Sequence, residues 1–467
     1  MKLRVSFALV IFALLFTNLC YAQIADYNFL GGGARARAMG GAFFAVSDDP
    51  SAGSWNPAGL SQLDLPQTNL TFYSGRVKVG HKFGDISRET KTSNDLILSG
   101  AVVIPFKVGG YQMVGSVSYE RLSVFSDQSY YYFAFSDDRT EEISGNVDAV
   151  TLSLGREFLK GFSAGMAVNI YTGGQTQKAS QFLSYVASGD SGIFYHPLVK
   201  GDYSGFNLHF GTMFKVQNFS FGAVVKTPFK LKEKIDAKME YDIVLGDYVN
   251  PRINQPWGYY YNTKNEWKLP LIWGIGSAFK TGDLIISVDI EYRDFSKTEL
   301  TYQRHPYAVD TTEAYAPNIN SPTKTVDLDW EKGTQFRIGG EYIVHTKLGK
   351  IPLRAGYRND PKVFTSVENV TWAFDSYMGD LRQFDEGSKG GKVEGSVISF
   401  GTGIAWEQIM FDITYEYSQY DYSSDGSTGY LYYNEDEEQL EVLYKLPFED
   451  KITNKDSRIM VGFTGYF

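Results

Sequence analysis

Apolar residues alternate with polar or small residues in many short segments between residue 69 and the C-terminus. In 283–293, aliphatic and aromatic residues occupy the even positions from Leu284 to Tyr292, and polar residues occupy the odd positions from Ser287 to Arg293. Successive side chains of a β-strand point to opposite faces, so this pattern predicts strands with one apolar and one polar face. A soluble β-sandwich shows the same alternation, so the pattern alone does not decide the class of protein.

The connections between these segments alternate strictly in length. We predict fourteen strands, at residues 69–80, 94–105, 110–124, 145–157, 160–172, 203–215, 217–228, 265–280, 283–296, 332–346, 350–358, 394–406, 408–420 and 455–467. Short turns, such as Thr281-Gly282-Asp283, are followed by long Tyr- and Asp-rich loops, which we expect at 81–93, 125–144, 173–202, 229–264, 297–331, 359–393 and 421–454. An even strand number with short turns at one end predicts an all-β membrane protein, a 14-stranded antiparallel transmembrane β-barrel.

The cost of placing charge in lipid decides which face of each strand points inward. An Arg or Lys at the lipid-facing midplane costs roughly 2–4 kcal/mol. We therefore expect Arg337, Arg354 and Arg358 to face the lumen. The aliphatic and aromatic face then meets lipid, and in strand 265–280 we expect one face to carry Trp267, Leu269, Leu271, Trp273 and Ile275.

The ends of the chain fit export to an outer membrane. Lys2 and Arg4 precede an apolar run from Val5 to Phe16, and small residues end at Ala22, which predicts a signal peptide over 1–22. That run is shorter than the ~20 residues of a membrane-spanning helix. Acylation at Cys20 is an alternative, although the residues before it lack the usual small side chain. The chain ends on Phe467, and a C-terminal aromatic resembles the signal read by the outer-membrane assembly machinery.

The composition argues against several classes of function. Cys20 is the single cysteine, and the five histidines lie far apart, so no thiolate or zinc-type spacing is present. The net charge of −10 argues against a nucleic-acid partner. Residues 189–192, Gly-Asp-Ser-Gly, lack the other members of a catalytic triad and are interpreted as a loop turn. We therefore expect no enzyme activity, no cofactor and no metal site.

Residues 23–67 do not alternate. They contain a Gly- and Ala-rich run over 31–42, the run Ala45-Val46-Ser47-Asp48-Asp49, and Trp55-Asn56-Pro57-Ala58-Gly59-Leu60. Small residues allow close packing in a confined lumen, and the Asp-Pro and Asn-Pro steps supply turn chemistry. We predict an N-terminal hatch over 23–67 inside a barrel over 68–467.

These three runs resemble the N-terminal hatch of the FadL/TodX family of outer-membrane transporters for long-chain fatty acids and aromatic hydrocarbons. The resemblance implies capture of ligand at external loops, an apolar pocket closed by the hatch, and lateral exit at a kink in the third strand. It implies ligand-binding or gating roles for Gln23, Tyr27, Phe29, Asn56, Pro57, Ala58 and Gly115, with the kink at Gly115. Candidates for holding a ligand carboxylate are Arg337, Arg354 and Arg358, whose alternative role is pairing with Glu341, Asp289 or Glu291.

A second resemblance leaves another function open. Met39-Gly40-Gly41-Ala42 and Trp55-Asn56-Pro57-Ala58-Gly59-Leu60 are similar to the PorV-like branch, which serves type IX protein secretion and surface attachment. The structural alternative for Asn56-Pro57-Ala58 is a turn between hatch and barrel. We expect a monomer in the bacterial outer membrane whose partners are outer-membrane lipids, lipopolysaccharide and a hydrophobic ligand such as a fatty acid, a hydrocarbon or a detergent.

Overall fold

A computed structural model of the chain describes residues 23–25 and 29–467, apart from 84–85, 134–135, 185–190, 246–247, 251–259, 304–322, 348, 368, 376–379, 386–387 and 435–438. The predicted signal peptide and Tyr27 lie outside the described residues, and so does the side chain of Gln23. The described helices are short, and none has the length and hydropathy needed to cross a bilayer.

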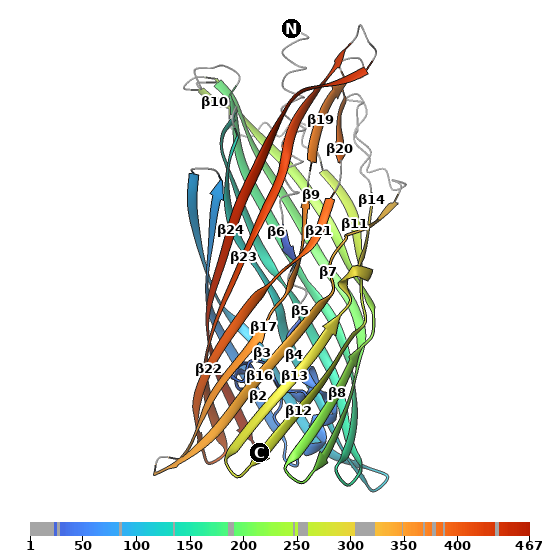
Figure 1. Ribbon diagram of the computed structural model, residues 1–467, viewed down its shortest axis with the longest axis vertical. Helices are drawn as coiled ribbons and strands as arrows, with labels where there is room; N and C mark the ends of the chain where they lie inside the picture. The colour runs from blue at the N-terminus through green and yellow to red at the C-terminus, as the bar shows by residue number, and fades with distance from the viewer. Residues whose placement is uncertain are drawn as a thin grey trace.

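The strands form one closed barrel (Figure 1). Its wall consists of β2 (Gln67–Phe83), β3 (Ile86–Val108), β4 (Tyr111–Phe133), β5 (Ser136–Leu159), β6 (Phe162–Ser184), β7 (Ser191–Val216), β8 (Phe219–Lys226), β9 (Phe229–Leu245), β11 (Tyr260–Leu269), β12 (Ile272–Thr281), β13 (Leu284–Arg293), β14 (Glu299–Gln303), β15 (Thr323–Asp327), β16 (Gly333–Thr346), β17 (Gly349–Asn359), β22 (Gly395–Trp406), β23 (Ile409–Asn434) and β24 (Gln439–Tyr466). Counting β8/β9, β11/β12, β13/β14 and β15/β16 as one crossing each gives fourteen antiparallel crossings, which confirms the predicted barrel. Pairing of β2 with β24, from Gln67 opposite Tyr466, closes the ring.

The short turns lie where the sequence predicts them, as at Gly282-Asp283 between β12 and β13. The long polar connections predicted between the other strands consist mostly of strands that extend beyond the predicted ends. In the hairpin of β4 and β5, for example, pairing continues to Phe133 opposite Ser136. Outside the membrane both faces of a strand meet water, so an extended hairpin rich in Tyr, Thr and Ser need not alternate in polarity.

The two faces of the wall differ in polarity as predicted. On β13, the side chain of Ile286 is 45% exposed on the outside, whereas Asp289 is fully buried inside. Arg337, Arg354 and Arg358 are also buried, on the inner face. The exposed apolar side chains, repeated around the barrel, make up the lipid-facing band expected of an outer-membrane barrel.

The prediction of one continuous strand over 265–280 was wrong. Pro270 and Leu271 separate β11 from β12, and the inward positions change from odd to even numbers across this break. Leu269 is therefore buried inside, whereas Leu271 and Trp273 are exposed outside. Proline lacks the amide hydrogen that a continuous ladder requires, so the strand is interrupted there. The neighbouring crossing breaks in the same way at Pro228, between β8 and β9.

The chain before the first wall strand lies inside the barrel, near the end that carries the short turns (Figure 1). This N-terminal segment, defined here as residues 29–66, contains α2 (Ala34–Ala38), α3 (Ala52–Trp55) and the 3-10 helix η2 (Pro57–Gln62). The wall approaches it closely through glycines: a Cβ added to Gly356 would lie 2.0 Å from Gly40 N, and one added to Gly165 would lie 2.3 Å from the Pro57 carbonyl carbon. The inner wall is thus shaped to the N-terminal segment.

The remaining elements are a small separate sheet, three short strands and a 3-10 helix. A three-stranded sheet combines β1 (Gln23–Ala25) with β18 (Lys362–Val367) and β21 (Ser388–Val393). The other short elements are β10 (Tyr248–Asn250), which pairs with β9, β19 (Asn369–Asp375), which pairs with β20 (Asp380–Asp385) and β23, and the 3-10 helix η3 (Phe295–Lys297).

Candidate functional site

Asn56, Pro57 and Ala58 anchor the N-terminal segment to the wall. The Asn56 Nδ2 atom donates hydrogen bonds to the Phe44 carbonyl at 2.8 Å and to the Thr212 carbonyl of β7 at 3.0 Å. Its Oδ1 atom accepts from the Ala58 N–H at 3.1 Å, which caps η2, with Pro57 in the first turn. Both polar atoms of the Asn56 side-chain amide thus form hydrogen bonds within the protein. These contacts fit the alternative in which Asn56-Pro57-Ala58 is a structural turn between hatch and barrel.

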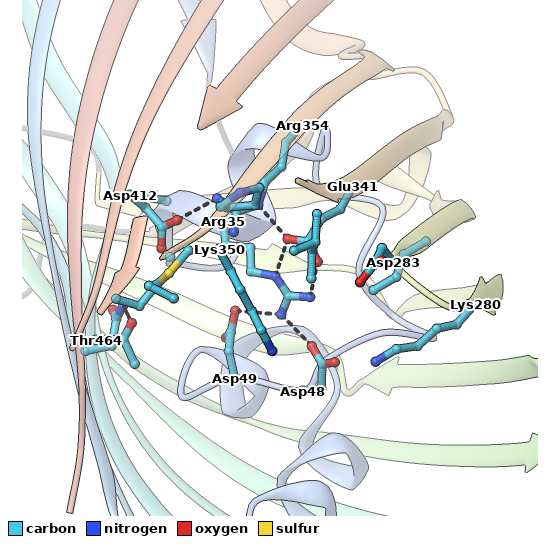
Figure 2. A pocket seen from close by; sticks show the side chains of 18 of the residues that line it. Arg35, Asp48, Asp49, Lys280, Asp283, Glu341, Lys350, Arg354, Asp412 and Thr464 are labelled. Carbon is cyan, nitrogen blue, oxygen red and sulfur yellow. Dashed lines mark hydrogen bonds and ion pairs between the residues drawn. The ribbon is translucent and has the colours of Figure 1, made fainter. Parts of the chain in front are cut away.

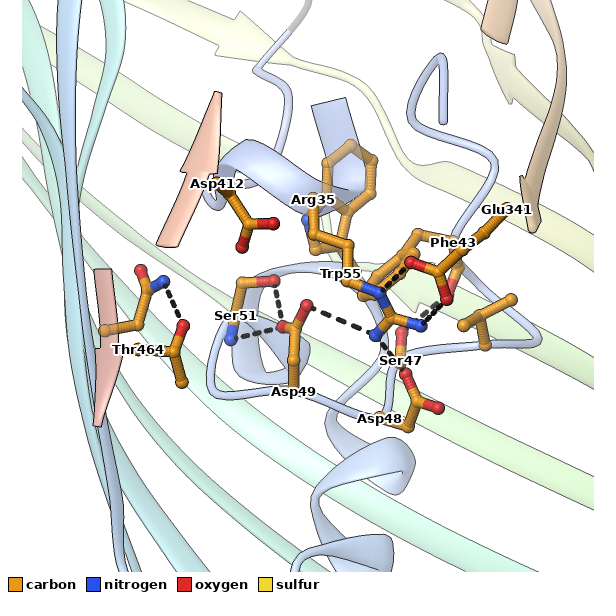
Figure 3. A network of polar contacts seen from close by, with 12 residues as sticks. Arg35, Phe43, Ser47, Asp48, Asp49, Ser51, Trp55, Glu341, Asp412 and Thr464 are labelled. Atoms are coloured by element: carbon orange, nitrogen blue, oxygen red, sulfur yellow. Dashed lines mark hydrogen bonds and ion pairs between the residues drawn. The ribbon is translucent and has the colours of Figure 1, made fainter. Parts of the chain in front are cut away.

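A charged cavity of about 220 Å³ lies beside the N-terminal segment, at the short-turn end of the lumen (Figure 2). Arg35 of α2 is at its centre. The Nε and Nη2 atoms of Arg35 donate to the two carboxylate oxygens of Glu341 on β16, each at 2.9 Å, and Nη1 donates to Asp48 at 2.5 Å. Asp49 lies 3.7 Å from the same guanidinium, as Figure 3 shows. The cavity therefore contains a set of ion pairs that joins the N-terminal segment to the wall.

The pKa values of this cluster reflect burial and pairing together. Burial disfavours the charged form of Arg35, but Asp48 and Glu341 outweigh it and raise its pKa well above the ordinary value. Burial raises the pKa of Asp49, and the nearby Arg35 offsets this only in part. Burial also lowers the pKa of Arg37 to about 10, in spite of the nearby Glu416.

The three arginines proposed from the sequence to hold a carboxylate are engaged in ion pairs of the wall. Arg337 bonds Glu291 at 2.8 Å, Arg354 bonds Glu341 at 2.6 Å and Asp412 at 2.5 Å, and Arg358 bonds Glu416 at 2.7 Å. The Arg337 guanidinium also lies 5.0 Å from the centre of the Phe44 ring. These contacts match the alternative structural role, with Glu291 and Glu341 among the predicted partners.

An aromatic cluster lies in the lumen next to the start of the N-terminal segment. Phe29 packs against Tyr171 with 5.7 Å between ring centres, and Tyr171 stacks on Phe229 at 4.5 Å. Tyr203 lies between Phe125 and Trp267 in the same cluster. At Pro228 and at Pro270 the inward-facing positions change between odd and even residue numbers. Phe229, Trp267 and Leu269 therefore face the lumen. The barrel interior thus contains an apolar surface at this level, and the Phe29 ring packs on it.

A small cavity of about 10 Å³ separates this cluster from polar side chains below it. Phe29 and Tyr171 line one side, and Glu120 and Lys226 line the other. Among the described residues, no carboxylate lies within ion-pair distance of the Lys226 ammonium. Lys226 is therefore a basic residue next to the aromatic cluster, and it is not among the arginines that the sequence analysis named.

The wall is incompletely paired beside this cavity. Pairing of β3 with β4 runs from Val108 opposite Tyr111 to Ser99 opposite Glu120 and ends there within the described residues. Residues 86–98 of β3 then pair only with β2, and residues 121–133 of β4 pair only with β5. The backbone edges of β3 and β4 are thus separate from Arg121 onward.

The expected kink at Gly115 is not found in the strand pairing. Gly115 is paired without interruption to Ile104 on one side and Leu154 on the other. The register of β4 shifts instead between Arg121 and Ser123, next to the separated edges. Both neighbouring strands remain hydrogen-bonded to β4 at Gly115, so the strand is not broken there. The missing Cβ instead contributes to a hollow on the outer surface of the barrel.

The other predicted gating residue at the N-terminus is described only in its backbone. Gln23 begins β1 and is paired with Thr365 of β18.

Sequence reasoning missed both Arg35 and Lys226 as residues of the site. Arg35 carries no pattern that identifies it, whereas Lys226 lies two residues before Pro228 in an alternating segment, and a proline there is a detectable sign of a strand break. Among the described residues, no group of three or more His, Cys, Asp or Glu side chains is placed to hold a metal ion.

The closed fourteen-stranded barrel, with its apolar exterior and charged interior, defines the chain as a bacterial outer-membrane β-barrel protein. No family model and no curated protein sequence matches it. Solved structures do. A FadL homologue of Pseudomonas aeruginosa superposes with a TM-score of 0.58 at 16% identity, covering 93% of this chain and 98% of the homologue.

Two toluene transporters are similar to a comparable extent. TodX of Pseudomonas putida has a TM-score of 0.56 at 13% identity, with 94% of this chain and 99% of TodX covered. TbuX of Ralstonia pickettii has a TM-score of 0.54 at 13% identity, with 94% of this chain and all of TbuX (100%) covered. The chain therefore has the fold of the FadL- and TodX-type outer-membrane proteins.

Proposed function

We propose that this protein carries hydrophobic small molecules inward across the outer membrane. The observation that supports this best is the contact of Phe29 with Tyr171 in a buried apolar cluster inside a lumen that also carries many charged and polar groups. An apolar surface in a polar channel attracts ligands that water expels. The proteins with the same fold include toluene transporters, which favours the same class of cargo here.

In this proposal the N-terminal segment, together with residues 23–28, acts as a hatch. The stretch from Gln23 through Tyr27 to Phe29 moves, and Phe29 leaves the aromatic cluster when ligand enters. The packing below supports a division between a moving tip and a fixed base: Asn56 is bonded to β7, and Arg35 is bonded to β16. The fixed base closes the lumen toward the periplasm.

Lys226 holds the head group of an acidic ligand in this account. Lys226 lines the small cavity together with Phe29 and Tyr171, next to the aromatic cluster on which the tail of the ligand would lie. Arg337, Arg354 and Arg358 are each paired with a carboxylate already, so a ligand carboxylate would compete with a buried anion at each of them. Long-chain fatty acids combine the tail and the carboxylate that this arrangement suits.

Ligand leaves sideways through the wall between β3 and β4. The unpaired edges begin directly beyond the pair of Ser99 and Glu120, and Glu120 also lines the cavity beside Phe29. An exit there releases a hydrophobic molecule into the bilayer and avoids the charged cavity around Arg35. We place the exit at the register shift near Arg121 rather than at Gly115.

Uptake of radiolabelled oleate tests the proposal, in cells whose own fatty-acid transporter has been removed. Deletion of residues 23–29 should reduce uptake, and Phe29→Ala should change the uptake rate, while both variants still assemble as barrels. The matched control is Phe210→Ala, which removes an outward-facing ring that is 44% exposed to lipid. The alternative role in type IX secretion predicts that none of these changes alters uptake, and that result would remove the transport proposal.

The protein works as a single barrel in this account, because one chain closes the complete ring of strands. Lipopolysaccharide surrounds its outer half, and the hydrophobic ligand is the one partner inside the lumen.

A further inference from the structure

The outer surface of the barrel has an apolar hollow centred on Gly115. It has a volume of about 570 Å³ and is lined by side chains of β3, β4, β5 and β6, among them Ile104, Leu154 and Met166. Gly115 points outward between Ile104 and Leu154, and a Cβ added to it would lie 3.3 Å from the Phe106 ring, which also lines the hollow. A hollow of this kind on the lipid-facing surface admits a hydrocarbon chain more deeply than the surrounding wall.

A cation is fixed at one end of this hollow. Arg156 follows Leu154 by two residues on the same face of β5, which places it about 7 Å farther along the strand. Its guanidinium lies 3.9 Å from the centre of the Tyr111 ring and 4.8 Å from the centre of the Phe158 ring. The two rings hold the cation on the membrane surface, and contact with ring faces leaves the N–H edges free to donate.

This cation has no anionic partner in the part of the chain that the structure describes. Among the described residues, no carboxylate lies within ion-pair distance of Arg156. The adjacent Glu157 belongs to the opposite face of the strand and accepts a hydrogen bond from the Gly161 N–H at 2.8 Å. An Arg on the lipid face of a barrel is costly unless an anion from the membrane interface pairs with it.

The position along the barrel decides which leaflet supplies that anion. Arg156 lies three residues before the end of β5 at Leu159, next to the short turn that leads to β6. Short turns of outer-membrane barrels face the periplasm, and Tyr111 and Phe158 belong to the aromatic girdle at that interface. The headgroups within reach of Arg156 are therefore those of the periplasmic leaflet.

We propose that the hollow at Gly115 and the Arg156 guanidinium together bind one glycerophospholipid of the periplasmic leaflet. An acyl chain fills the hollow, and the phosphate accepts hydrogen bonds from the Arg156 N–H groups between the rings of Tyr111 and Phe158. This site lies on the outer surface and does not depend on the proposed transport function.

Native mass spectrometry of the mature chain in phospholipid-free detergent tests this inference, with dioleoylphosphatidylglycerol and dioleoylglycerol as probes. Arg156→Gln should weaken binding of the phosphatidylglycerol about tenfold, from the loss of hydrogen bonds to a charged group, and leave the phosphate-free lipid unchanged. Gly115→Leu should weaken binding of both lipids, because the new side chain fills the hollow.

Two matched controls isolate the site. Lys347→Gln removes an exposed cation in another short turn, and Gly340→Leu fills an outward-facing glycine elsewhere on the wall, where an added Cβ meets only the Ile285 carbonyl at 3.5 Å. Both should bind the two lipids as the unaltered chain does. Equal phosphatidylglycerol binding by Arg156→Gln and the unaltered chain would overturn the proposal, even if Gly115→Leu failed to fold. Lipid A is the third probe, and a preferential loss of its binding in Arg156→Gln would overturn the assignment to the periplasmic leaflet.

Discussion

Arg35 and Glu341 form a bidentate ion pair, with Nε and Nη2 each 2.9 Å from a separate carboxylate oxygen. The pair joins α2, at the start of the chain, to β16, far along the wall. Glu341 also accepts from Arg354, and Arg35 also donates to Asp48, so the pair is the centre of a larger set of contacts. This set fixes the base of the N-terminal segment, while the ring of Phe29 at its start packs on the aromatic cluster in the lumen.

Replacing Arg35 should loosen the N-terminal segment and leave the barrel assembled. Arg35→Ala leaves Asp48 and part of Glu341 without a partner, and breaking such a buried pair costs about 3 kcal/mol. Hydrogen exchange of residues 34–62 should therefore become faster, with little change in the wall strands. Lys350→Ala, at an exposed residue that lines the same cavity, is the control. Unchanged exchange in Arg35→Ala would show that packing alone holds the segment.

A side chain at Gly356 should displace the N-terminal segment from the wall. The added Cβ of Gly356→Ala would lie 2.0 Å from Gly40 N, a contact that forces the backbone to move, and overpacking of this kind costs about 1–3 kcal/mol. We expect faster protease cleavage within residues 29–66 of the folded barrel. Gly340→Ala on the neighbouring strand faces outward and should have no effect; equal cleavage of both variants would contradict the close fit.

Stability should depend on pH through Asp49. Its pKa is raised in the folded protein, chiefly by burial, so the unfolded carboxyl group ionises first as the pH rises from 4. The folded state retains the proton longer, and the unaltered chain therefore loses stability relative to Asp49→Asn between pH 4 and neutral pH. Urea unfolding in lipid vesicles across this range measures the difference. A gain in stability of the unaltered chain relative to Asp49→Asn would contradict the assigned direction.

Lys226 should distinguish acidic from neutral ligands. Lys226→Met removes the ammonium group and keeps a side chain of similar length with an apolar stem. Uptake of oleate should fall about tenfold, because one charge-assisted contact is lost. Uptake of toluene should be unchanged. Lys280→Met changes a cation of the charged cavity around Arg35, away from the aromatic cluster, and should not separate the two ligands. A parallel fall for oleate and toluene in Lys226→Met would assign Lys226 a structural role.

Much of the barrel could be predicted from the sequence, because lipid on one side and charge on the other impose a strict alternation. Asp289 and Ile286 are on the predicted faces for this reason. The pattern failed at Pro270, where the strand changes phase, so Trp267 faces inward while Trp273 faces outward. The aromatic cluster depends on such phase changes.

The pairing of charges could not be predicted in the same way. The sequence places Arg354 inside, but its partners Glu341 and Asp412 come from other strands whose register the alternation leaves open. For the same reason Arg35 was not recognised as a partner of Glu341. Hairpin extensions such as that of β4 were missed because water on both faces removes the alternating signal.

Quenching of Trp267 fluorescence by a brominated fatty acid tests the central claim most directly, since bromine acts only at short range and Trp267 belongs to the aromatic cluster around Tyr203. The difference in emission between the unaltered chain and Trp267→Phe isolates this residue from the lipid-facing Trp273 and Trp406. A hydrophobic ligand that enters the lumen and displaces Phe29 should quench this component in saturable fashion. Equal quenching in both proteins, from the outer surface alone, would contradict a binding site in the lumen.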